Sequence, residues 1–303
     1  MPRFNTSDGL SLFYEIEGSG LPLLCLSGLT RDSRDFDYVL PHLRGCQVIR
    51  LDYRGRGKSD WAKDFTTYNI MREAQDAMEL LDHLGLDKAA ILGTSRGGLI
   101  AMGLAATLKA RLIGVALNDI GPELDPNGLD VIMGYLGIKP KVKTLEDAAN
   151  ARAHVMRDMF PNISMTRWME EVNKFFMQTP DGLELSYDPK LRDAVEATSH
   201  AAVPDLWPWY EALSDLPLAI LRGANSDLLT QACYEDMLKR IPTATGAVIA
   251  DRAHVPFLDE PEAVPCCKRG SQKCNEYRHD QGCFCARTRG CAPHTAVVLV
   301  IFG

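Results

Sequence analysis

The chain has 303 residues, of which 46% are hydrophobic and 24% charged. This composition excludes the disordered and fibrous classes, and the length allows either two compact units or one large α/β unit with an insertion, of which we favour the second. The formal net charge of -7 disfavours nucleic acid and anionic membranes as partners, because both attract basic surfaces. No signal-like start and no apolar run of about 18 residues is found, so we expect a cytoplasmic protein.

Seven segments have the patterns of β-strands. Residues 11–17 alternate apolar and polar side chains, and the other six are nearly continuous apolar runs, typical of strands buried on both faces. These six are residues 21–27, 47–52, 89–94, 112–118, 216–222 and 246–250. Helical spacing of apolar residues lies between several of them, for example over 70–81. The alternation predicts an α/β fold with a mostly parallel sheet and helices on both faces.

The alternation stops between residues 121 and 214, where no good strand pattern appears. Thr144 and the acidic residues after it resemble a capping box, and residues 165–176 have a second amphipathic helical pattern. A loop of this length without structure is not expected. We therefore predict a helical cap over 121–214, inserted into a core formed by residues 1–120 and 215–264.

The strand predicted over 89–94 runs into Gly-Thr-Ser-Arg-Gly at 93–97, and a helix follows at once. G-x-S-x-G between a strand and a helix is typical of a nucleophile elbow, in which small residues on both sides of the serine permit a sharp turn. The alternative is a glycine-rich turn with a capping serine. The strand–turn–helix context favours Ser95 as a nucleophile.

A serine nucleophile needs a base and a carboxylate that orients the base. His254 follows the strand predicted over 246–250, and Asp227 follows the one over 216–222. Both therefore belong to the carboxyl edge of the sheet, where ligands bind in open α/β folds. We predict Ser95, Asp227 and His254 as the catalytic residues. Asp119, directly after the strand over 112–118, is the alternative acid.

The loop Ser-Gly-Leu-Thr at 27–30 follows the first buried strand. Gly28 lets the chain turn there, and the backbone N–H of Leu29 can then join that of Arg96 in an oxyanion hole. A plain glycine turn is the alternative for these four residues.

Together these motifs resemble the α/β-hydrolase superfamily of esterases, lactonases and C–C hydrolases, over residues 1 to about 264. Residues 52–60 are similar to its D-x-R-G-x-G-x-S loop, and residues 254–261 to its histidine loop. The superfamily's chain order of nucleophile, acid and base supports Asp227, whose loop resembles the family pattern more closely than that of Asp119 does. Serine at 95 argues against the haloalkane dehalogenase and epoxide hydrolase branches, which the resemblance associates with Asp at that position.

Two positions depart from the family pattern. Ser27 stands where many members have histidine, which removes an imidazole behind the oxyanion hole. Arg96, directly after the nucleophile, is bulky and charged. It could meet an acidic substrate, but we expect a solvated arginine paired with a nearby carboxylate.

The resemblance and the residues together predict a serine hydrolase that cleaves a small to medium, largely apolar carboxylic ester without a cofactor or metal. An enol-lactone or C–C bond hydrolase with the same triad, and a non-catalytic small-molecule receptor on the same scaffold, are the alternatives. Trp207 and Trp209 lie where the chain returns from the cap to the sheet, and we predict that they form a pocket wall.

The segment 265–303 has a different composition from the rest of the chain. It holds six of the nine cysteines, and its Lys and Arg residues outnumber its acidic residues six to two. The cysteine spacing lacks the paired C-x₂₋₄-C pattern of structural zinc sites, and a disulfide framework is not expected in the cytosol. Our hypothesis is a reading-frame shift near codon 265.

The coding DNA tests this hypothesis directly. We expect one of the other two frames downstream of codon 265 to encode an amphipathic helix of about 15–20 residues, because the family continues with such a helix after the histidine loop. Absence of that pattern from both frames, or stoichiometric zinc in the purified protein, would contradict the frame shift.

Overall fold

The computed structural model describes residues 1–199 and 204–263. Its centre is an eight-stranded sheet in the order β1-β2-β4-β3-β5-β6-β9-β10. The strands are β1 (Arg3–Asn5), β2 (Ser11–Gly18), β3 (Leu21–Leu26), β4 (Cys46–Leu51), β5 (Ala89–Thr94), β6 (Leu112–Asn118), β9 (Leu218–Gly223) and β10 (Thr245–Ile249). β2 pairs antiparallel with β1 and β4. The neighbouring strands β4, β3, β5, β6, β9 and β10 are all parallel to one another. The predicted fold class is confirmed.

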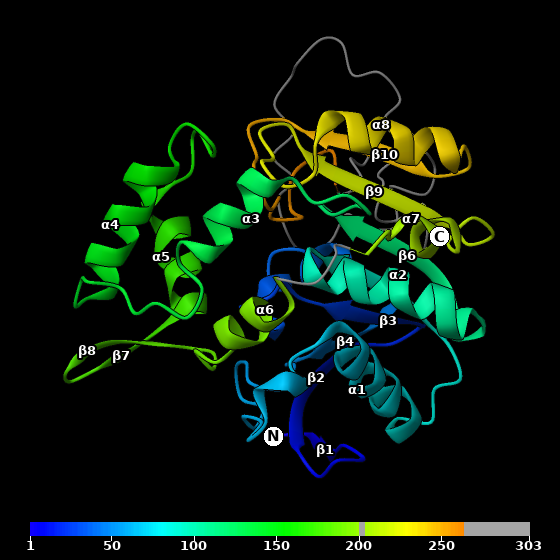
Figure 1. Ribbon diagram of the computed structural model, residues 1–303, viewed down its shortest axis with the longest axis horizontal. Coiled ribbons are helices and arrows are strands. Elements are labelled where there is room, and N and C mark those ends of the chain that lie inside the picture. Colours follow the sequence, from blue (N-terminus) through cyan, green and yellow to red (C-terminus); the bar gives the residue numbers. More distant parts are fainter. Residues whose placement is uncertain (200–203, 264–303) are drawn as a thin grey trace, which may run out of the picture.

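Side chains of the central strands alternate between two apolar layers. On one face, Leu24, Ile91 and Ile220 pack with α1 (Ile70–His83), α2 (Arg96–Leu108), α7 (Trp207–Glu211) and α8 (Gln231–Arg240). On the other face, Cys25 and Leu92 pack with residues of the short helices η1 (Ser33–Phe36) and η2 (Leu40–His42). Figure 1 shows the strands running from β1, near the N-terminus, to β10, with α1 and α2 beside the sheet. Burial on both faces explains why these strands read as continuous apolar runs.

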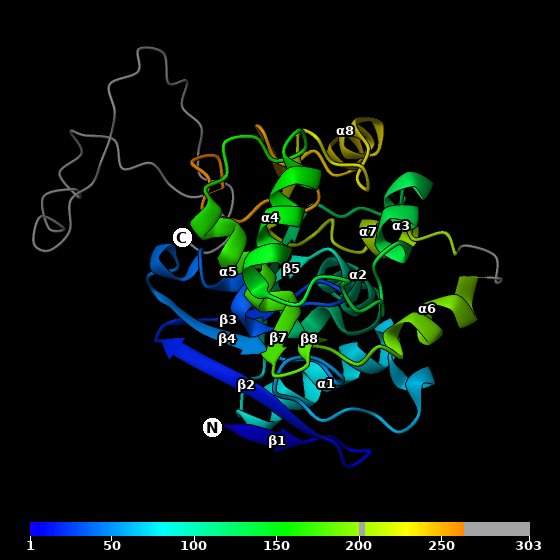
Figure 2. The ribbon, with the colours of Figure 1, turned by 90° about the vertical axis from the view of Figure 1, so that its left-hand side faces the viewer.

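Most of the segment between β6 and β9 forms a separate layer beside the sheet, and its last helix, α7, returns to pack on α2. The segment contains α3 (Pro126–Met133), α4 (Leu145–Met156), α5 (Met165–Phe175), β7 (Phe176–Thr179), β8 (Gly182–Leu185), α6 (Leu191–Ser199) and α7. Figures 1 and 2 show α4, α5 and the β7-β8 hairpin standing together on one side of the molecule. Thr144 caps α4 as expected, because its side chain accepts a hydrogen bond from the Asp147 N–H.

The antiparallel β7-β8 hairpin is a difference from the helices expected throughout this segment. Its turn contains Pro180, Asp181 and Gly182, and Gly182 has a φ of +134°. Pro-Asp-Gly is a strong turn signal between strands, so the sequence held an indication of the hairpin. β8 alternates between intermediate and buried residues, whereas β7 has no such alternation, so only the turn and one short strand indicate the hairpin.

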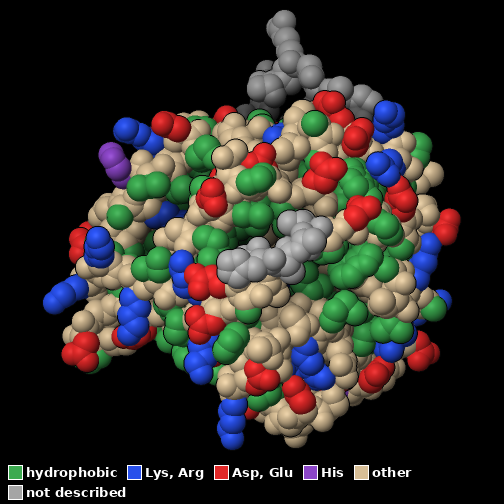
Figure 3. All heavy atoms as spheres, viewed as in Figure 1, with side chains coloured by type: hydrophobic (Ala, Val, Ile, Leu, Met, Phe, Trp, Pro, Cys, Tyr) green, Lys and Arg blue, Asp and Glu red, His purple; other side chains and the backbone are tan. Residues whose placement is uncertain are grey.

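Within residues 1–199 and 204–263, no helix is both long and apolar enough to cross a membrane. On the face in Figure 3, acidic and basic side chains are interspersed rather than gathered by sign. The segment 265–303, with the frame-shift hypothesis attached to it, lies outside the described residues.

Candidate active site

Ser95 occupies the sharp turn between β5 and α2, with a φ of +50°. A Cβ atom added at Gly97 would lie 1.9 Å from the Leu26 carbonyl oxygen, and one at Gly93 would lie 2.6 Å from the Gly97 carbonyl oxygen. Neither contact is possible, so only glycine fits at these two positions. The close backbone approach predicted from G-x-S-x-G is confirmed.

Ser95, His254 and Asp119 form one continuous chain of hydrogen bonds. The Ser95 hydroxyl lies 2.9 Å from Nε2 of His254, and Nδ1 of the same ring lies 2.7 Å from Oδ2 of Asp119. With the proton on Nδ1, the ring donates to the carboxylate and accepts from the serine. This arrangement has the order of contacts found in a nucleophile, base and orienting acid.

Asp119 is fully buried directly after β6, where its φ is +54°. The Gly223 N–H donates to its Oδ1 at 2.7 Å, and the Ser226 hydroxyl donates to its Oδ2 at 2.6 Å. Both donors come from the end of β9 and the loop after it. Together with His254 they hold the carboxylate in place from three directions.

The sequence prediction of Asp227 as the partner of His254 is wrong. Asp227 lies in the loop after β9, and its carboxylate makes no hydrogen bond or ion pair within the part of the chain that the structure describes. Instead this loop contributes the hydroxyl of Ser226, one residue earlier, to Asp119. The fallback acid, Asp119, is the one that the fold brings to the histidine.

The predicted oxyanion loop lies against the elbow. A Cβ at Gly28 would be 3.9 Å from the Ser95 Cβ, and the Gly97 N–H donates to the Ser27 carbonyl oxygen at 3.1 Å. Neither the Leu29 N–H nor the Arg96 N–H has an acceptor among the described residues. Two backbone donors beside the serine are therefore available to an oxyanion.

A buried carboxylate is connected to both of these backbone donors through two arginine side chains. Glu73 of α1 binds Arg56 at 2.6 Å and Arg96 at 2.5 Å, and Arg56 also donates to the Leu29 carbonyl oxygen at 2.9 Å. Burial raises the pKa of Glu73, but the Arg56 and Arg96 guanidiniums outweigh it and lower the pKa, so the carboxylate stays charged. Arg96 pairs with a nearby carboxylate as expected, although the pair is buried rather than solvated.

Replacing Glu73 by Gln tests how much its ion pairs with Arg56 and Arg96 contribute to stability. We expect the free energy of unfolding to fall by about 3–5 kcal/mol, because the change leaves two guanidiniums in the interior without a counter-charge. Asp82→Asn on the same helix removes an exposed pair with Arg111 and should cost at most about 1 kcal/mol. Chemical denaturation of both variants measures the difference, and equal losses would contradict the role assigned to Glu73.

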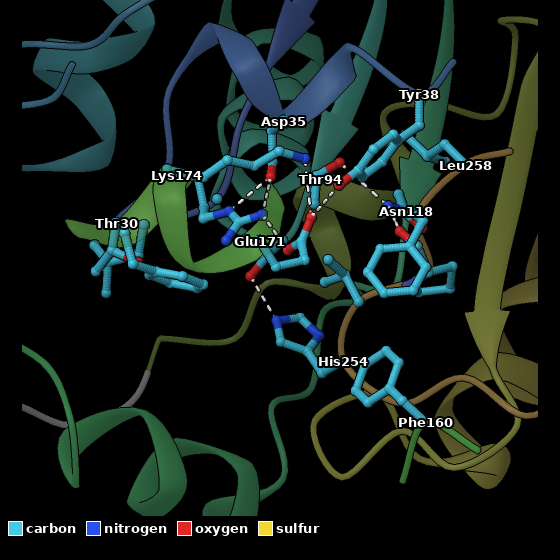
Figure 4. Close-up of a pocket in the computed structure, with 18 of the residues that line it drawn as sticks. Thr30, Asp35, Tyr38, Thr94, Asn118, Phe160, Glu171, Lys174, His254 and Leu258 are labelled. Atoms are coloured by element: carbon cyan, nitrogen blue, oxygen red, sulfur yellow. Dashed lines mark hydrogen bonds and ion pairs between the residues drawn. The ribbon is translucent and has the colours of Figure 1, made fainter. Parts of the chain in front are cut away.

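A cavity of about 90 Å³ opens above Ser95 and His254. The cap contributes Tyr135, Phe160, Trp168 and Phe175 to its walls, and the core contributes the rings of Tyr38 and Phe257. Figure 4 shows Asp35, Glu171 and Lys174 gathered on one side of it, with the His254 ring pointing into the same space. The cavity therefore combines aromatic walls with a charged side.

Trp207 and Trp209 do not line this cavity, so the predicted pocket wall is wrong. Both lie on α7, which packs on α2 in the apolar layer of the sheet. A Cβ at Gly103 of α2 would lie 3.1 Å from the Trp209 ring, and the Trp207 indole N–H donates to Glu123 at 2.7 Å. Their aromatic surface is used for packing, while Trp168 and Phe175 of α5 face the cavity.

Within the described ranges, no cluster of His, Cys, Asp and Glu is arranged to hold a metal ion.

Comparison with known proteins agrees with this architecture. A family model described as an alpha/beta hydrolase family matches residues 23–264. A 3-hydroxybutyrate-oligomer hydrolase of Cupriavidus necator is 34% identical over 252 residues, which are 80% of this chain and 85% of that protein. Esterase YbfF of Escherichia coli is 24% identical over 226 residues, 72% of this chain and 79% of that protein. The crystal structure of an alpha/beta hydrolase from Novosphingobium aromaticivorans has a TM-score of 0.80 at 38% identity, covering 86% of this chain and 93% of that one.

Proposed function

Because the chain belongs to the alpha/beta hydrolase family, we propose that it is a serine hydrolase that cleaves a small to medium carboxylic ester through an acyl-enzyme. The observation that carries the proposal is the hydrogen-bonded chain from Ser95 through His254 to Asp119. The two unpartnered N–H groups of Leu29 and Arg96 beside the serine support it.

In the first half-reaction, the Ser95 oxygen attacks the ester carbonyl carbon while Nε2 of His254 takes the hydroxyl proton. The carbonyl electron pair moves to its oxygen, where the Leu29 and Arg96 N–H groups stabilise the negative charge. When this pair re-forms the carbonyl, the bond to the alcohol breaks, and the leaving oxygen takes the proton from His254. The products are the free alcohol and an ester of Ser95.

Water completes the cycle by the same route. His254 takes a proton from the attacking water, and the second tetrahedral intermediate collapses to release the acid and return the proton to Ser95. Asp119 keeps its charge throughout, holds the ring with Nδ1 protonated and stabilises the imidazolium. Its hydrogen bonds from Gly223 and Ser226 leave the carboxylate little freedom to move.

The size of the cavity and its aromatic walls favour a short ester over a peptide or a long lipid chain. The relative from Cupriavidus necator is named for hydrolysis of 3-hydroxybutyrate oligomers, which are short esters. We therefore propose short-chain esters as the substrate class.

Substitution of each carboxylate distinguishes the two candidate acids. Asp119→Asn should lower kcat by about 10³- to 10⁴-fold, since an amide cannot stabilise the protonated ring as a carboxylate does. Ser95→Ala should lower it by about 10³-fold or more. Asp227→Asn is the matched control and should leave kcat within about twofold, with thermal melts confirming that all three variants fold. A larger loss in Asp227→Asn than in Asp119→Asn would overturn the assignment.

A series of p-nitrophenyl esters from acetate to palmitate, run beside an enol-lactone and a vinylogous diketone, tests the reaction class. We expect the highest kcat/KM for short acyl chains and covalent labelling of Ser95 by a fluorophosphonate. Fast lactone or C–C cleavage with poor ester turnover would contradict the ester proposal and indicate a lactone or C–C bond hydrolase with the same triad. Ligand binding without labelling or turnover would point to a receptor.

A further inference from the structure

Arg152 of α4 lines the cavity above Ser95 without a hydrogen bond or ion pair to any residue that the structure describes. Its Nε is buried, and its guanidinium lies 4.6 Å from the centre of the Phe175 ring. An aromatic face attracts a cation but satisfies none of its in-plane N–H donors. Arg152 is only partly exposed, and a buried Nε–H with no acceptor is costly unless something else pairs with it.

The other charged residues of the cavity neutralise one another. Arg31 binds Asp35 at 2.6 Å and Glu171 at 2.7 Å, and Lys174 binds Glu171 at 2.9 Å. Burial raises the pKa of Glu171, but Arg31 and Lys174 outweigh it and lower the pKa, so this carboxylate is charged. Arg31, Lys174 and Arg152 thus face only two carboxylates on the cavity wall. One positive charge is left over, and the member of the group without a partner is Arg152.

A second cavity adjoins this one, and no carboxylate of the described residues lines it. Its volume is about 270 Å³, and Tyr135, Arg152 and Phe175 line both spaces. Lys139 and Lys141 also line it, whereas no Asp or Glu is among its lining residues. Lys139 is paired with Glu184 and Lys141 is exposed, so Arg152 is, among the described residues, the partly buried, unpaired cation at the boundary of the two cavities. An anion at this boundary would meet the positive charge of Arg152, with no carboxylate from the described part of the chain on the wall of the second cavity.

We propose that Arg152 binds a carboxylate of the substrate, so that the preferred ester carries a free acid group. This inference rests on the proposed ester hydrolysis and adds the chemical class of the substrate. A planar guanidinium matches a carboxylate through two parallel hydrogen bonds. The aromatic walls hold the apolar part of the ester, and Arg152 fixes its charged end relative to Ser95.

Matched pairs of acidic and neutral esters test the proposal. Mono-p-nitrophenyl glutarate against p-nitrophenyl pentanoate places the acid on the acyl side, and 4-acetoxybenzoate against 4-acetoxybenzamide places it on the alcohol side. We expect the wild-type kcat/KM to favour the acid in at least one pair by about tenfold or more, after correction for uncatalysed hydrolysis. Arg152→Gln should abolish that preference, because it lowers kcat/KM for the acidic ester about tenfold or more relative to its neutral partner.

Arg157→Gln is the matched control, because Arg157 directly follows α4 and its side chain is 68% exposed. It should keep the wild-type preference. A calorimetric titration with glutarate gives a readout that does not need turnover: we expect its Kd to rise about tenfold or more in Arg152→Gln and to be unchanged in Arg157→Gln.

The outcomes separate the two proposals. Turnover of neutral esters without any preference for acids, or glutarate binding that Arg152→Gln does not weaken, would overturn the carboxylate site and leave ester hydrolysis standing. Equal losses for acidic and neutral esters in Arg152→Gln would mean that Arg152 is structural, and would also overturn it. Glutarate binding that depends on Arg152, with no ester turned over by the wild type, would reject the hydrolase and keep the carboxylate site.

Discussion

The buried carboxylate of Glu73 constrains both halves of the proposed oxyanion hole. It binds Arg56, which holds the Leu29 carbonyl oxygen, and Arg96, whose own N–H is the second donor. Two guanidiniums around one carboxylate leave a surplus positive charge in the interior, and the rings of Tyr53 and Tyr68, 5.5 and 5.6 Å from Arg56, lie against it. Such a cluster adds little net stability over an apolar core. The cluster instead fixes the relative positions of helix α1, the elbow and the loop after β3, because none of them can shift alone without leaving a charge unpaired.

Most of the core could be predicted from the sequence because its signals are local. Strands β5 and β6 begin and end at the predicted residues, since each is an apolar run bounded by clear turns. Ser95 and His254 are also predicted from local signals, since Ser95 directly follows β5 and His254 lies in the loop after β10. The acid is not: β6 and β9 are neighbours in the sheet, only about 5 Å apart, so the loop after either can reach the histidine. Only the contacts of Ser226 and Gly223 with Asp119 decide between them.

The cap was predicted less well because its side chains have two apolar surroundings, its own core and the sheet's helices. Helical spacing gives a buried face but does not say what covers it. Trp209 packs beside Gly103 of α2, a partner 106 positions earlier in the chain, whereas Trp168 lies in the cap and faces the cavity. The choice between these surroundings depends on how the cap sits on the core, which no local pattern encodes.

Charged and polar contacts, together with apolar ones, hold the cap on the core. Arg31 and Tyr38 of the core bind Glu171 of α5, Arg34 donates to the Asn173 carbonyl oxygen, and Arg167 of α5 binds Asp259 beside the histidine loop. Ion pairs have strict geometry, so they orient the cap more sharply than apolar contact does. They also bring charged side chains to the edge of the cavity, which therefore cannot be wholly apolar. For this reason we propose an ester with both an apolar body and an acid end, in place of the largely apolar ester expected from the sequence alone.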